Sequence, residues 1–181
     1  WQPLWDTPGG ITGLAQASDR ALLIFKEHSI YIMELTGSDE LFHFSLLSSS
    51  IGTRYAKSIV TVGRDVYFIE TNGRPHVVRN LSTIEEIGHG VVSTFFGATY
   101  WGGSRRKEQD SSLFDVSLVV PNPYGAYSPS WNSIFWTYAF YLTPSSGSPE
   151  TAIYWVHRAL CYAIAEDKWY EYELVRNDLS A

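Results

Sequence analysis

The sequence has 181 residues, enough for a domain with a hydrophobic core, and 45% of them are hydrophobic while only 18% are charged, which excludes an intrinsically disordered chain. The formal net charge of −6 disfavours binding of nucleic acid through a basic surface. The single cysteine, Cys161, excludes an intramolecular disulfide and a zinc site built from several cysteines. No apolar run is long enough to cross a membrane as a helix. Because the chain begins at Trp1 in the middle of a strand pattern, we expect a fragment or a processed product.

Two segments in the first half share a turn-and-strand pattern. Asp19 to Phe25 reads DRALLIF and Gly63 to Ile69 reads GRDVYFI, so that each has a polar turn followed by an apolar strand. The offset, 63 − 19 = 44 residues, is close to the length of one four-stranded propeller blade. A short polar turn follows each strand, Lys26 to His28 in the first segment and Thr71 to Arg74 in the second, and predicts a hairpin in each.

Helix signals are scarce in this sequence. Ser82 to Gly88 reads STIEEIG and has the pattern of a capping box, with Glu85 three residues after Ser82 and Gly88 as a stop. This pattern predicts one or two helical turns, and a strand or loop stays open as the alternative.

A looser third copy follows in the second half. Ser128 to Phe140 reads SPSWNSIFWTYAF, with a turn at residues 131–133 and a strand from Ile134. Arg158 to Leu174 then predicts a hairpin whose turn is Ala165 to Lys168.

The repetition predicts an all-β fold, because a short antiparallel sheet buries its faces by stacking on copies of itself. We expect a single domain of about three to four propeller-like blades, at approximately residues 10–50, 51–97 and 113–176. These blades would form part of a larger or incomplete propeller. An irregular β-sandwich is the alternative.

Four groups of short motifs occur in order between Gly10 and Gly73. They are ITGL from Ile11, LLIFK followed by SIY from Leu22, SIG from Ser50, and SIV, VYF and NG from Ser58. In this order they resemble the β-propeller virion proteins of tailed bacteriophages, such as tail hub, tail nozzle and tail tubular proteins.

This resemblance implies a structural protein of the virion tail that is assembled in the host cytoplasm. It implies a ring of about six copies that contact each other and neighbouring tail proteins, such as an adaptor and a tail fibre. The ring would surround the DNA exit channel, and the genomic DNA would pass through transiently without specific binding. No membrane partner is expected.

Residues able to carry chemistry are scattered. A propeller glycosidase needs two carboxylates facing each other across a sugar bond, and the sequence offers Asp65, Glu70, Asp115, Glu166 and Asp167. Three of these acids, Asp65, Glu166 and Asp167, are explained by their place in turns. The five histidines show no HxH or HExxH spacing. We therefore expect no enzymatic activity, no cofactor and no metal site.

Aromatic residues crowd the region from Tyr124 to Tyr141. Packing between blades explains most of them, and a protein interface is the functional interpretation because Tyr and Trp anchor such contacts. The possible interface residues are Tyr124, Tyr127, Trp131, Arg105 and Arg106. The alternative function is a carbohydrate- or receptor-binding β module, and a propeller glycosidase is the less favoured third.

Overall fold

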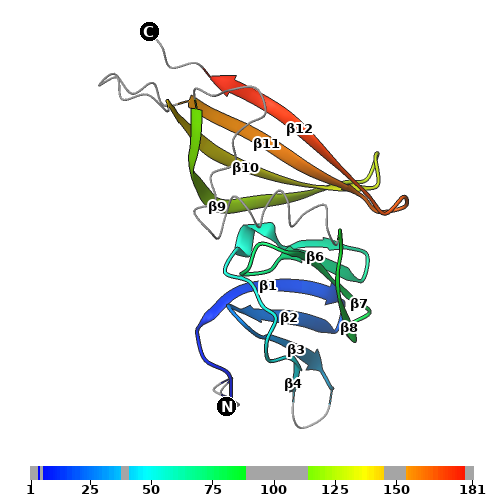
Figure 1. Cartoon of the computed structure of the whole chain (residues 1–181). Coiled ribbons are helices and arrows are strands. Elements are labelled where there is room, and N and C mark those ends of the chain that lie inside the picture. The colour runs from blue at the N-terminus through cyan, green and yellow to red at the C-terminus, as the bar shows by residue number, and fades with distance from the viewer. Residues whose placement is uncertain (1–3, 5, 38–40, 89–113, 145–153, 178–181) are drawn as a thin grey trace. The chain divides into compact units, whose positions relative to one another are not determined.

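The computed structural model describes residues 4, 6–37, 41–88, 114–144 and 154–177, and in the second half it describes side chains for residues 123–137 and 159–172. The described part is all-β, as predicted. Its twelve strands form three antiparallel sheets of four strands, and its only helical segment is the three-residue 3-10 turn η1 (Ala56–Ser58) (Figure 1).

The first sheet contains β1 (Ile11–Ser18), β2 (Ala21–Lys26), β3 (Ile30–Leu35) and β4 (Phe42–Ser48). Each strand pairs with its neighbour in sequence, so that the sheet is a simple meander in the order β1-β2-β3-β4. The runs LLIF and IYIM form its two central strands because β-branched and aromatic side chains pack well on a pleated sheet.

The second sheet repeats this meander with shorter strands. It contains β5 (Val60–Val62), β6 (Asp65–Ile69), β7 (Pro75–Arg79) and β8 (Thr83–Glu86). Pro75 is the first residue of β7, a position at which the missing backbone donor is tolerated.

The expectation of a helix in STIEEIG is wrong, because this segment forms β8. The reason is the turn before it, where Asn80 and Leu81 both have positive φ, 49° and 58°. This tight turn reverses the chain and pairs β8 with β7. The hydroxyl of Ser82 donates to the carbonyl of Arg79 at 3.3 Å, where a capping box would direct it forward to Glu85.

The third sheet has the longest strands: β9 (Phe114–Ser128), β10 (Ser133–Pro144), β11 (Tyr154–Ala163) and β12 (Lys168–Asn177). It is again a meander, in the order β12-β11-β10-β9. The predicted hairpin between Arg158 and Leu174 is present as β11 and β12.

The chain divides into two compact units, Trp1–Ile87 and Gly88–Ala181. The first two sheets belong to the first unit and the third sheet to the second unit. The expected single domain and its blade boundaries stay predictions.

The 44-residue offset is present in the structure, because β2 begins at Ala21 and β6 begins at Asp65. The two sheets stack face to face (Figure 1). Leu23 and Phe25 of the first sheet share one hydrophobic core with Val66 and Phe68 of the second. The rings of Phe25 and Phe68 meet edge to face, with centroids 5.1 Å apart.

The two sheets meet through opposite faces. The offset places Leu23 and Phe25 at the positions of Tyr67 and Ile69, and these residues alternate with Val66 and Phe68 along β6. We call the face with Leu23 and Phe25, and its equivalent in the second sheet, the front of each sheet, and the other face the back. The front of the first sheet therefore packs on the back of the second.

The connector between the sheets is held in this stack by backbone contacts. The amide of Thr53 donates to the carbonyl of Lys26 at 2.9 Å, and the amide of Thr71 donates to the carbonyl of Gly52 at 3.1 Å. Only glycine fits at position 52, because a Cβ there would lie 2.3 Å from the Lys26 carbonyl oxygen and 2.5 Å from the Ser29 nitrogen. The connector thus joins the β2–β3 turn to the β6–β7 turn.

Candidate interaction surfaces

The back of the first sheet is a wide apolar surface. Strand register places eleven side chains on this face, of which nine are apolar or aromatic: Leu14, Gln16, Leu22, Ile24, Lys26, Tyr31, Met33, Leu35, Phe42, Phe44 and Leu46. Leu14 is 57% exposed, Phe42 40% and Leu46 44%. Scattered exposed apolar residues are normal on a protein surface, but a contiguous set on one sheet face indicates an interaction site.

A hollow of about 350 Å³ lies on this back face. Apolar side chains that include Leu22, Met33 and Phe42 line it, and Asp19 and Arg20 contribute charged groups. The guanidinium of Arg20 binds within its own sheet, because it donates a hydrogen bond to the carbonyl of Leu35 at 3.2 Å. The hollow is therefore an apolar depression with a polar end.

A short N-terminal strap lies against the same face. Lys26 is 3% exposed, and its ammonium donates to the carbonyls of Leu4 at 2.9 Å and Thr7 at 2.5 Å. A buried lysine is stable only when its donors are bound, so these two carbonyls fix the strap to β2.

Tyr31 holds the strap from the neighbouring strand. Its hydroxyl donates to a carboxylate oxygen of Asp6 and contacts the hydroxyl of Thr7 at 2.8 Å. Burial, followed by the hydrogen bond and negative charge of Asp6, raises the pKa of Tyr31 above its ordinary value of 10.0. The strap is thus anchored through its backbone by Lys26 and through its side chains by Tyr31.

The third sheet carries an exposed aromatic face. Tyr124, Tyr170 and Tyr172 lie on this face and are 57%, 41% and 46% exposed. The central strands between them contribute Phe135, Thr137, Ala159 and Cys161 to this face, and of these Ala159 and Cys161 are buried.

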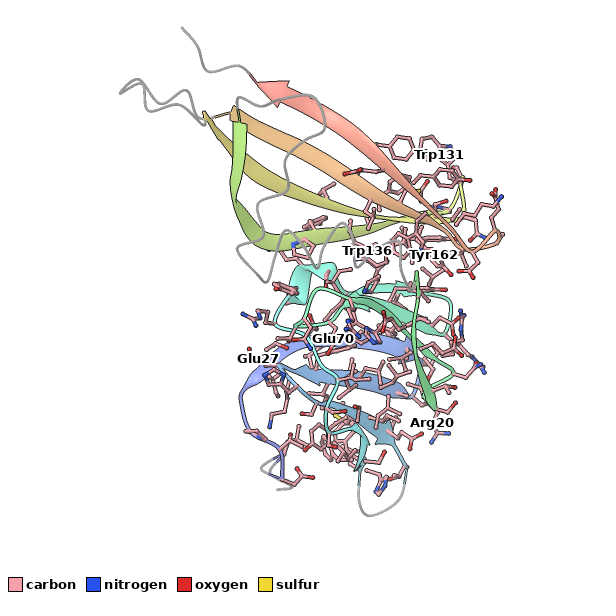
Figure 2. All side chains as sticks on the ribbon, in the orientation of Figure 1. Arg20, Glu27, Glu70, Trp131, Trp136 and Tyr162 are labelled. Carbon is pink, nitrogen blue, oxygen red and sulfur yellow. The ribbon has the colours of Figure 1, made fainter. Side chains whose placement is uncertain are left out.

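Trp131 lies in the β9–β10 turn at the end of this sheet (Figure 2) and is 70% exposed. Its ring contacts Phe135, with centroids 5.6 Å apart. Phe135 shares the sheet face of Tyr170, so Trp131 extends the exposed aromatic face beyond the strands.

The residues expected at an interface do not all lie on this surface. Tyr124 and Trp131 do, but Tyr127 is half-buried on the opposite face, where it pairs with Ile134 and donates to Asn132 at 3.1 Å. Arg105 and Arg106 fall outside the described residues.

The opposite face of the third sheet carries a compact aromatic cluster. The indole of Trp136 is fully buried and stacks on Trp169, with centroids 5.7 Å apart. Tyr162 contacts Trp169 at 4.8 Å and donates to Asp167 at 2.8 Å. This cluster belongs to the hydrophobic core. Trp136 is therefore a core residue, whereas Trp131 is exposed.

The described acids considered for glycosidase chemistry are bound by near neighbours in sequence or in the same sheet. Asp65 forms an ion pair with Arg79 at 3.0 Å, and Arg79 forms a second ion pair with Glu85 at 2.8 Å. The hydrogen bond that Arg79 donates to Glu85 is the largest cause that raises the pKa of Arg79 above its usual value.

Two further acids of this group, Glu70 and Glu166, lie in turns and accept hydrogen bonds. Glu70 accepts from the amide of Asn72 at 3.0 Å, and Glu166 accepts from Tyr170 at 3.2 Å. The side chain of Asp115 lies outside the described residues. Within the described ranges, no three His, Cys, Asp or Glu side chains gather where they could hold a metal ion.

Comparison of the sequence with protein-family models and with curated proteins found no match. Among the described residues, no helix has the length and hydrophobicity needed to cross a membrane.

The back of the first sheet was missed by sequence reasoning. Its signal is present in LLIF and IYIM, where both alternating positions are apolar, which is typical of a strand covered on both faces. In the structure the second sheet covers only one of these faces.

Proposed function

We propose that this chain is a structural, non-enzymatic component of a larger assembly, built from propeller-like stacked sheets that act through their apolar faces. The observation that carries this proposal is the front-to-back packing of the first two sheets, in which Leu23 and Phe25 meet Val66 and Phe68. A sandwich with two-fold symmetry brings equivalent faces together, whereas front-to-back packing repeats one step along a stack.

Two sheets packed in this way leave, by themselves, one front and one back without a partner sheet. Heterologous packing of this kind closes only when the repeated rotation completes a ring, as in propellers, and otherwise extends as an open array. The exposed apolar back of the first sheet supports this interpretation, because a finished two-layer sandwich would have polar outer faces.

The resemblance of Gly10 to Gly73 to phage tail propellers supports a place in a virion tail. In this role the chain would form part of a hub or nozzle ring around the DNA exit channel, in contact with its own copies and neighbouring tail proteins. A net charge of −6 suits a channel wall, because acidic surfaces repel the phosphates of passing DNA.

Mass spectrometry of purified, intact phage particles tests this role. We expect peptides of this chain in a constant ratio to known tail proteins, and we expect them to remain after washing in high salt. Particles that are infectious and lack the chain would contradict the proposal. A soluble, unassembled chain found only in the infected cell would contradict it as well.

A second candidate function is the binding of a glycan, and the exposed aromatic face of the third sheet favours it. The aromatic side chains of Tyr124, Tyr170, Tyr172 and Trp131 are each at least 41% exposed. Flat aromatic rings contact the apolar faces of sugar rings, and the tyrosine hydroxyls and Glu166 supply hydrogen-bonding groups.

A glycan array with two matched variants tests this second function. Trp131→Ala should abolish binding and leave the melting temperature unchanged, because the indole is 70% exposed. Phe42→Ala, also at an exposed aromatic residue but on the first sheet, should leave binding intact. A wild-type chain that binds no glycan on the array would contradict the second function without affecting the first.

A further inference from the structure

We propose that the back of the first sheet is the docking face for a further four-stranded antiparallel sheet that carries the front of this same repeat. The inference deepens the proposed structural function and rests on its front-to-back packing. The occupant is defined by its chemistry: small residues on the first strand and large aliphatic or aromatic residues on the next two, as in Ala15 of β1, Phe25 of β2 and Ile32 of β3.

The back of the second sheet is covered by the first sheet. There Val66, Phe68 and Val78 lie in the core that they share with the first sheet, and His76 stacks on Phe68 with ring centroids 5.7 Å apart. Ile84 of β8 packs against the same core. This back is therefore known to accept the front of a sheet of this repeat.

The back of the first sheet has equivalent residues at the same register. Leu22 and Ile24 correspond to Val66 and Phe68, and the pairing of Leu22 with Met33 repeats that of Val66 with Val78. Leu22 and Met33 are larger than Val66 and Val78, whereas Ile24 is smaller than Phe68. All three first-sheet residues are apolar, so this back is as apolar as the covered one.

The fourth strands of the two sheets, β4 and β8, also place equivalent residues on the back face. In the first sheet, Phe44 pairs with Met33 at the position that Ile84 holds opposite Val78. Its neighbour Leu46 lies where the second sheet has Glu86. An apolar residue has thus replaced a charged one at a position that is 44% exposed.

The N-terminal strap resembles the connector between the first two sheets. The strap precedes β1 as the connector precedes β5, and at their ends the hydroxyls of Thr12 and Thr53 donate to the equivalent carbonyls of Phe25 and Ile69. Ile51 packs against the core between the first two sheets, and Thr7 is 7% exposed against Ser29 and Tyr31. The strap therefore lies where a connector lies when a sheet covers the back beside it.

The hollow lies over the half of the back face that the strap does not cover. Ile24 and Tyr31, beside the strap, are 4% and 2% exposed, whereas the far half of the face is open at Leu35 and Phe42. The hollow of about 350 Å³ lies over this open half and has the volume of several side chains. Leu and Phe side chains from an incoming front would fill it and remove the exposed apolar surface from water.

A tandem insertion tests the proposal with the chain itself. A second copy of Ala15–Ile59, 59 − 15 + 1 = 45 residues, is inserted after Ile59, so that Ala15 takes the register position of Val60 and one first sheet precedes another. We expect a folded monomer with one cooperative transition and a melting temperature equal to or above that of the wild type, because each added interface stabilises the stack.

A matched insertion makes the result interpretable. It carries Leu22→Gln and Met33→Gln in the second copy only, where the proposal places these residues in a new buried interface. The melting temperature should fall by about 10 °C relative to the unmodified insertion. The same two substitutions in the wild-type chain, where both residues are half-exposed, should lower it far less. Equal effects in the two backgrounds, or an insertion that unfolds or aggregates, would overturn the docking proposal.

Analytical ultracentrifugation of the wild-type chain tests the alternative that a second copy of this chain covers the back of the first sheet. We expect no oligomer that depends on Phe42, because a second whole chain has its first-sheet front covered, and Tyr67, Ile69 and Val77 on its second-sheet front are at most 1% exposed. A defined dimer that Phe42→Gln dissociates would identify a second copy as the occupant and overturn the proposal. These outcomes are independent of whether the chain is found in virions, so the docking face and the tail role can fail separately.

Discussion

The hydroxyl of Thr71 donates a hydrogen bond of 2.5 Å to the backbone carbonyl of Glu27, which lies 44 residues earlier in the chain. The two residues occupy corresponding turns of the first and second sheets, at the ends opposite the β1–β2 turn that carries Arg20 (Figure 2). The 44 residues between the bonded residues equal the offset between β2 and β6. The bond therefore joins the β2–β3 turn of the first sheet to the equivalent β6–β7 turn of the second.

Removal of this hydroxyl should loosen the stack. Thr71 is 1% exposed, so Thr71→Val keeps the shape and leaves the Glu27 carbonyl without this donor. We expect the free energy of unfolding to fall by about 1.5 kcal/mol, measured by urea denaturation. Thr71→Ser retains the donor and should recover most of the loss. A valine variant as stable as the serine variant would show that the bond contributes nothing.

Gly52 should tolerate no side chain. A Cβ there would lie 2.3 Å from the Lys26 carbonyl oxygen, and backbone atoms cannot move aside as a flexible side chain can. Gly52→Ala should therefore lower the free energy of unfolding by about 2 kcal/mol or more. Gly10→Ala is the matched control, because no atom lies within 4 Å of its Cβ position, and it should change stability by less than about 0.5 kcal/mol. Equal losses would contradict the close approach of the connector.

The buried tyrosines should make the first unit sensitive to alkali. Burial raises the pKa of Tyr31, Tyr55 and Tyr67 above 10.0, and Asp6 raises that of Tyr31 further. A pKa that is higher in the folded chain gives stability that is fully present below about pH 10, the pKa in the unfolded chain, and is lost as the pH rises through the folded value.

The variant Tyr31→Phe tests this dependence on pH. It should be less stable than the wild type at pH 8, because the bonds to Asp6 and Thr7 are lost. Its stability should fall less steeply between about pH 10 and 12, since one titrating group is gone. Urea denaturation across this range measures both slopes. Parallel curves would mean that Tyr31 titrates alike in the folded and unfolded chains.

The repeat was predictable from sequence because two local signals agree within it. Polar turns precede and follow each apolar strand, and the offset between Asp19 and Gly63 is reproduced by the first residues of β2 and β6. Turn chemistry and alternation are local properties, so they survive without knowledge of tertiary contacts.

The error at β8 has the opposite cause. Ser82 and Glu85 satisfy a capping-box pattern, but the conformation is decided by Asn80 and Leu81, and leucine is an unusual residue at positive φ. Tertiary pairing with β7 outweighed a weak local preference for helix.

The candidate surfaces were predictable only in part. Trp131 lies in a turn, so its exposure follows from the sequence. The separation of Tyr124 from Tyr127 depends on the register of β9 against β10, which no local pattern specifies. The exposed back of the first sheet depends on which of its two apolar faces the second sheet covers, and the sequence does not distinguish them.

A double-mutant cycle on Phe25 and Phe68 tests the front-to-back packing most directly. Their rings lie 5.1 Å apart across the two sheets, so Phe25→Leu and Phe68→Leu should couple by about 0.5–1.5 kcal/mol in urea denaturation. Ile69 lies on the opposite face of the second sheet, and a cycle of Phe25→Leu with Ile69→Val should be additive. Coupling of Phe25 to Phe68 alone is the predicted result; additivity for Phe68 together with coupling to Ile69 would contradict the account.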